Sequence, residues 1–207
     1  MAAPGMTSPI RTAAFDNLQL NAGVFLVGFD YSSITDSTAL KTAIKTAIST
    51  PANILGVTRG GGSFTVTRER RVPEVDGIRY PFVGGEFIDS ADAYLSGTSL
   101  EVNPTNWQRF LTSATATTSG KKTTLKMHTA IDAANDYLDH LCWVGDISDG
   151  RCVLIELDNA MNTADFSFTF QDKNEGTVPF EFHAHQDDVG DYDEAPFRIV
   201  FFDNPST

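Results

Sequence analysis

The sequence predicts a mainly β protein, an antiparallel sandwich or barrel with a flanking α-helix. About ten short β-rich runs are separated by turn residues, and alternation of apolar and polar residues is clearest at Phe166-Ser-Phe-Thr-Phe170. Only two segments have helical periodicity, and strands and helices do not alternate in a βαβ order. A chain of 207 residues is also long enough to bury a core without disulfides.

The amino-terminal residues 1–20 show neither the helical nor the strand periodicity of apolar residues. We therefore expect an extended arm outside a single domain that spans 21–207. Ala22–Asp30 is apolar on both parities, which predicts a strand covered on both faces. Asp36 is placed to cap a helix over 37–49, whose apolar stripe is narrow. We expect this helix to lie against a sheet.

Four β-rich runs follow, at 54–58, 63–72, 78–83 and 91–101. Asp76-Gly77 predicts a tight hairpin turn between the second and third of these runs. Pro73 and Pro81 cannot donate hydrogen bonds to a central ladder. We therefore expect this hairpin to lie at an edge or to project from the body.

A second, shorter helix is expected where Asn103 can cap a turn that begins at Pro104 and buries Trp107, Phe110 and Leu111. The Thr/Ser/Gly/Lys stretch 112–123 predicts an exposed loop. The remaining runs predict strands at 124–131, 137–144, 151–157, 166–170, 178–184 and 197–202, with turns at Asp149-Gly150 and at 173–176. Together, 166–170 and 178–184 would place five aromatic side chains on one buried face.

Charge and cysteine content exclude several classes of protein. The net charge of −12, with pI ≈ 4.6, has the wrong sign for general binding to nucleic-acid phosphates. Cys142 and Cys152 are too few for a disulfide framework, and we expect free buried thiols in a protein folded in a cytosol. No apolar run is long enough for a membrane span, and residues 1–20 have no signal-peptide core.

The glycine-rich stretch Thr58–Phe64 is the nearest approach to a cofactor motif. It lacks the Gly-Lys-Ser/Thr of a nucleotide-binding loop and leads into a strand, where such a loop would open a helix. We therefore interpret these glycines as allowing a close backbone approach or a bulge. We expect no cofactor, and the sequence offers no candidate for nucleophilic catalysis.

Glu181, His183 and His185 form a weak candidate metal site, because alternation puts all three on one face of a strand. A cupin-like metal enzyme also has a His-x-His strand, and this remains the alternative function from a different class. In such an enzyme a Glu follows the His-x-His strand by a few residues and a second motif supplies a further His. Here the next Glu after His185 is Glu194. The simpler interpretation is a solvated or interface face whose histidines pair with carboxylates.

Arginines cluster on the predicted projecting hairpin and are interleaved with acidic residues. We expect contacts between subunits from six residues: Arg68, Arg70, Arg71, Glu74, Asp76 and Arg79. Such a mixed patch suits docking onto an acidic surface, and the surface of this protein is acidic. The alternative is a solvated strand with incidental ion pairs.

Five stretches occur in the order and spacing of one known family: Leu20–Phe25, Leu55–Phe64, Arg71–Gly77, Tyr94–Glu101 and Gly176–His185. On these stretches the chain resembles the major tail tube protein of long-tailed (siphovirus-like) bacteriophages. The resemblance implies a β-sandwich with a flanking helix and a structural virion protein, not an enzyme. It also implies that the protein is assembled in the bacterial host cytoplasm and that it resides in the phage tail.

The resemblance further implies hexameric rings that stack into a tube. The tube would enclose the tape-measure protein, contact tail terminator and distal tail proteins, and pass double-stranded DNA without binding it specifically. By this analogy residues 1–20, 68–80 and 112–123 bridge neighbouring subunits and rings. An acidic lumen would repel phosphates and let DNA slide. A related baseplate or injection-system tube protein is a second structural alternative.

Overall fold

The computed structural model describes residues 12–77, 79–187 and 193–205. The strands of this part are β1 (Val24–Val27), β2 (Thr58–Arg71), β3 (Phe87–Ser99), β4 (Ala114–Ser119), β5 (Lys122–Met127), β6 (Leu138–Asp146), β7 (Cys152–Asn162), β8 (Thr169–Gln171), β9 (Asn174–His183) and β10 (Phe197–Phe202). The helices are α1 (Ser37–Ile48) and α2 (Pro104–Leu111), with short 3-10 turns η1 (Thr12–Asn17) and η2 (Pro51–Asn53). The mainly β class with flanking helix is confirmed.

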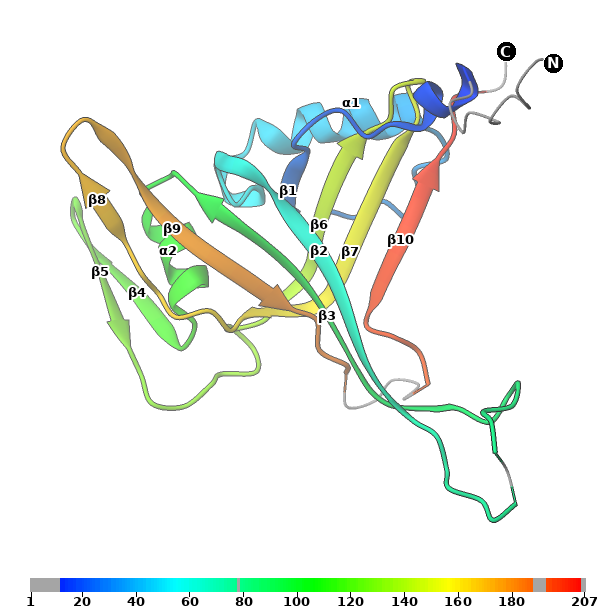
Figure 1. The fold of residues 1–207 in the computed structure, drawn as a ribbon. Helices are drawn as coiled ribbons and strands as arrows, with labels where there is room; N and C mark the ends of the chain where they lie inside the picture. Colours follow the sequence, from blue (N-terminus) through cyan, green and yellow to red (C-terminus); the bar gives the residue numbers. More distant parts are fainter. Residues whose placement is uncertain (1–11, 78, 188–192, 206–207) are drawn as a thin grey trace.

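One large antiparallel sheet folds over itself into two layers. Its strand order is β1-β6-β7-β9-β3-β2, with β10 paired to β7 and β8 paired to β9. Most of β7 pairs with β6 and β10, whereas its last residues, Met161 and Asn162, pair with β9. Figure 1 shows the layer of β2, β3 and β9 crossing in front of the layer of β6, β7 and β10. Strands β4 and β5 form a separate two-stranded sheet.

Aromatic side chains fill the space between the two layers. The ring of Phe25 on β1 meets that of Phe180 on β9 edge-on, with centroids 5.3 Å apart. Phe110 on α2 stacks on the same Phe180 ring at 5.5 Å. These contacts tie three elements distant in sequence into one core. Aromatic pairs of this kind contribute about 1 kcal/mol beyond their buried area.

Helix α1 covers the other face of the β1-β6-β7-β10 layer. Leu40 of α1 packs in the same buried cluster as Leu26, Cys142 and Leu154. The helix begins as predicted, because the Asp36 carboxylate accepts hydrogen bonds from the first free backbone amides. Strand β1 is shorter than expected but is covered on both faces, as its apolar residues of both parities predict.

The glycine-rich stretch lies inside β2. The register with β3 shifts between Thr58 and Gly62, which is the irregularity that the glycines were expected to allow. A Cβ atom at Gly62 would lie 2.6 Å from the backbone oxygen of Ser96 and 2.7 Å from the Phe25 ring. Glycine is therefore required here for close approach of the two strands.

The segment between β2 and β3 differs from the prediction. A turn forms at Asp76-Gly77, but the predicted strand at 78–83 is wrong: 79–83 carry no strand, and residue 78 lies outside the described residues. The described residues between β2 and β3, 72–77 and 79–86, form a long connection, here called the hairpin connection. Pro73 and Pro81 remove ladder donors from it, and no strand in the described part of the chain pairs with it. Its predicted projection from the body and the edge position of β2 are confirmed (Figure 1).

Two further expectations are corrected. Residues 112–123 are not a loop, because β4 and β5 pair around a two-residue turn that places Ser119 opposite Lys122. The β-branched threonines favour a strand, and Gly120 supplies the positive φ of +62° that the turn needs. Strand β8 has only three residues, and Phe170 is exposed, so four of the five predicted aromatic side chains pack inward.

The amino-terminal segment is only partly described. Residues 1–11 of the predicted arm lie outside the described residues. Residues 12–17 form η1 instead of an extended stretch, and the backbone of Gln19 bridges to Ile147. The division into 1–20 and 21–207 stays a prediction.

Candidate functional site

The outer face of the β2-β3-β9 layer is a continuous polar surface. Leu95 on β3 lies opposite Phe182 on β9, and both side chains point into the core. The side chains at alternate positions of these strands therefore point outward. Twelve polar side chains at these outward positions, here called the polar sheet face, are Ser63, Thr65, Thr67, Glu69, Ser90, Asp92, Tyr94, Ser96, Thr98, Thr177, Glu181 and His183. At these twelve positions three carboxylates stand beside one imidazole, with no lysine or arginine among them.

His183 joins two strands of the polar sheet face. Its Nδ1 lies 2.9 Å from a carboxylate oxygen of Asp92 on β3, and its Nε2 lies 3.0 Å from one of Glu181 on β9. A neutral imidazole has one N–H, so both contacts are hydrogen bonds only in the imidazolium form. Burial alone would lower the pKa of His183, but these two carboxylates outweigh it and raise the pKa. The imidazolium therefore clamps β3 to β9.

The three candidate metal ligands are only partly brought together. Glu181 and His183 are in direct contact, and both nitrogens of His183 are already used. His185 follows the end of β9, and its Nδ1 lies within 3.2 Å of the backbone oxygens of His183 and Asn159. Its ring meets Tyr137 edge-on. The geometry favours the interpretation of histidines paired with polar neighbours over a shared ligand set.

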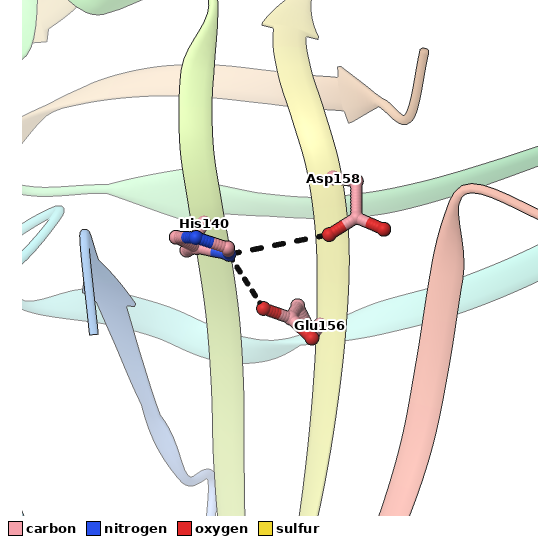
Figure 2. Close-up of side chains that lie close together, drawn as sticks. All are labelled: His140, Glu156 and Asp158. Atoms are coloured by element: carbon pink, nitrogen blue, oxygen red, sulfur yellow. Dashed lines mark hydrogen bonds and ion pairs between the residues drawn. The ribbon is translucent and has the colours of Figure 1, made fainter. Parts of the chain in front are cut away.

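A second polar group, missed in the sequence, lies on the outer face of β6 and β7 (Figure 2). His140 Nδ1 is 2.7 Å from Glu156 and 4.0 Å from Asp158. The Glu156 side chain is only 3% exposed, and it also accepts hydrogen bonds from Tyr31 at 2.5 Å and Arg198 at 3.1 Å. Burial is the largest cause of a raised pKa of Tyr31, and the hydrogen bond to Glu156 raises this pKa further.

This group could offer metal ligands, because one ligand atom from each of His140, Glu156 and Asp158 lies within 4.8 Å of the others. However, Arg198 already contacts both carboxylates, at 3.1 Å from Glu156 and 3.0 Å from Asp158. The arrangement therefore works as a satisfied ion-pair network around a buried carboxylate. The only hint in the sequence is a Glu within the apolar β7 run.

An open cleft of about 390 Å³ adjoins this network, here called the acidic cleft. Its lining residues are Asp139, His140, Asp158, Asn159, His185, Gln186, Asp187, Glu194, Ala195, Pro196 and Arg198. Four carboxylates thus line the cleft beside a single guanidinium. Its negative potential favours positively charged partners.

The six predicted subunit-contact residues lie on the projecting hairpin or its base. Arg70 and Arg71 pair with Glu86 at 3.8 Å and Asp89 at 3.0 Å in the same hairpin. Arg68 lies opposite Ala91, and Arg79 lies in the hairpin connection, outside the paired strands. Glu74 and Asp76 are exposed in the connection as well. The patch is therefore mixed in charge rather than basic.

Large apolar side chains are the more distinctive feature of this hairpin. Tyr80 is 81% exposed and Val83 is fully exposed. The exposed set comprises Val72, Val75, Tyr80, Phe82, Val83, Phe87 and Ile88. Such a concentration on one projection is typical of an interaction surface.

The two cysteines are free and buried, as predicted. The register places Cys142 opposite Glu156 and Cys152 opposite Asp146, so the thiols do not face each other. Burial raises the pKa of both thiols, that of Cys152 to about 11. Both therefore stay protonated near neutral pH.

The fold and these surfaces define a mainly β protein with a polar outer sheet face and a projecting apolar hairpin. No protein-family model matches the chain, and no curated protein matches it. Neither helix in the described ranges has the length and apolar character needed to cross a membrane.

Proposed function

We propose that the chain is a structural subunit of a bacteriophage tail tube. Six copies would close into a ring, and rings would stack into a hollow tube around the tape-measure protein. The five matching sequence stretches support this proposal. The mainly β fold with a flanking helix is compatible with it.

The observation that carries the proposal is the exposed apolar surface of the hairpin connection. Val83 is fully exposed and Tyr80 is 81% exposed on a segment that projects into solvent (Figure 1). Leaving such side chains in water costs free energy that burial against another molecule recovers. An interface between copies supplies this burial along the whole tube.

The edge of the sheet supports assembly as well. β2 is the last strand of its layer and is fourteen residues long. Within the described part of the chain, only β3 pairs with it. A free edge of this length is a template for pairing with another chain.

The polar sheet face fits the wall of a channel. Hydroxyl groups predominate there, and Glu69, Asp92 and Glu181 add negative charge without lysine or arginine among the twelve residues of the polar sheet face. A mildly acidic wall repels phosphates, so DNA would pass during ejection without specific binding. Tail terminator and distal tail proteins would be the partners at the two ends of the tube, in the virion.

Self-assembly tests this function. We expect the purified protein, concentrated in the presence of tail-assembly partners, to give rings and tubes in negative-stain micrographs and fast species in sedimentation velocity. Monomers alone at every concentration would refute the proposal. Closed rings that never stack would favour the related baseplate protein instead.

A further inference from the structure

The β4-β5 hairpin carries only positive charges, whereas the chain as a whole is acidic. Residues 112–127 include Lys121, Lys122 and Lys126 and no Asp or Glu, in a chain with 27 acidic residues. All three lysines are exposed. Within the described residues none of them forms a salt bridge. Their charge is therefore available for a partner.

The hairpin is built to project these charges. The strands pair in register around a turn at Gly120 and Lys121, which puts Lys121 and Lys122 at the tip. β4 and β5 form a sheet of their own that packs on α2. Figure 1 shows them at the opposite side of the molecule from β10. The tip is thus presented away from the acidic cleft of its own chain.

The acidic cleft carries the complementary charge. It lies where β6 and β7 meet the segment before β10, and it holds four carboxylates beside Arg198. Asp139 and Glu194 are exposed at this cleft. Because the basic tip and the acidic cleft are different surfaces of one chain, a contact between them joins copies head to tail. Such heterologous contacts propagate into rings or filaments.

We propose that the β4-β5 hairpin of one copy docks its lysine tip in the acidic cleft of a second copy. This inference rests on the proposed assembly and names one pair of surfaces that would hold it together. A second copy is favoured over a nucleic acid because the net charge of −12 repels a polyanion from the protein as a whole. Two copies carry the same net charge, so the attraction between them is local, between the lysine tip and the four carboxylates of the acidic cleft.

Charge reversal and rescue test the docking. Lys121→Glu/Lys122→Glu should raise the concentration needed for assembly about tenfold or more, since like charges then meet at the contact. Asp139→Lys/Glu194→Lys should weaken assembly in the same way. Combining the four changes should restore it, because attraction returns with its sign exchanged. Lys45→Glu/Lys173→Glu alters charge equally on other exposed lysines and should have a much smaller effect.

Three results would overturn this inference while leaving the proposed function standing. The first is normal assembly of the Lys121→Glu/Lys122→Glu protein in tubes of wild-type appearance. The second is failure of the four-residue combination to rescue, although both parent variants keep wild-type unfolding temperatures. The third is that the wild-type protein binds a labelled DNA duplex and the Lys121→Glu/Lys122→Glu protein loses this binding while its assembly is unchanged. The tip would then be a site for a polyanion. Failure of the wild-type protein to assemble would instead refute the proposed function.

Discussion

Replacing two exposed side chains of the hairpin connection, Tyr80→Ser and Val83→Ser, should block assembly without destabilising the monomer. Tyr80 is 81% exposed and Val83 fully exposed, so little of either side chain contributes to the fold of a single copy. Burying a side chain of this size at an interface contributes about 1.5 kcal/mol or more. Losing both should cost about 3 kcal/mol per contact, which is on the order of 100-fold in the association constant.

Sedimentation velocity over a concentration series measures this change, and thermal unfolding of the monomer provides the control. The matched variant Val102→Ser/Phe170→Ser removes exposed apolar side chains elsewhere on the surface. It should assemble nearly as well as wild type. If the Tyr80→Ser/Val83→Ser protein assembles at the wild-type concentration, the hairpin connection is not an interface and the reasoning from its exposure fails.

Three further predictions concern the fold. Gly62→Ala should lower the free energy of unfolding by about 1–3 kcal/mol in urea titrations, because the new methyl group meets the next strand; an unchanged midpoint would contradict the close approach. Because the pKa of His183 is raised by folding, its stabilisation is complete below pH about 6.5 and is lost as pH rises through the folded pKa. Thermal unfolding across pH should show this loss, and a His183→Gln protein with the same pH profile would exclude the clamp. Glu156→Gln should cost about 2 kcal/mol, because a neutral amide replaces the buried charged acceptor of Tyr31 and Arg198, whereas an effect below about 0.5 kcal/mol would show that the network adds no stability.

Local signals in the sequence predicted much of the fold. The Asp36 cap and the apolar stripe after it are sufficient to predict α1, and residues 197–202 are predicted to the residue as β10. Pro73 and Pro81 correctly indicated that the hairpin leaves the sheet. These features depend on neighbours in the chain, which is why a single sequence reveals them.

The β4-β5 hairpin was missed for a physical reason. Its Thr, Ser, Gly and Lys residues are typical of loops, and only the β-branched threonines around Gly120 indicate a strand pair. The two strands pair with each other and pack against α2, and these contacts favour the strand conformation over a loop. Composition alone does not show that these residues have a partner strand.

The polar groups of the candidate sites depend on the tertiary fold. Glu156 meets Tyr31, which is 125 residues away, and Arg198, 42 residues away. His183 was singled out in the sequence, but its partner Asp92 is 91 residues away and becomes visible only with the register of β3 and β9. The histidine was therefore predictable as a polar feature, whereas its role as a clamp was not.

A helical reconstruction of the assembled particles tests the central claim most directly. We predict a hollow tube whose bore is lined by the polar sheet face, with Glu69, Asp92 and Glu181 turned inward and the hairpin connection buried between subunits. A tube whose bore is lined by another face, with Tyr80 and Val83 still in solvent, would contradict the account.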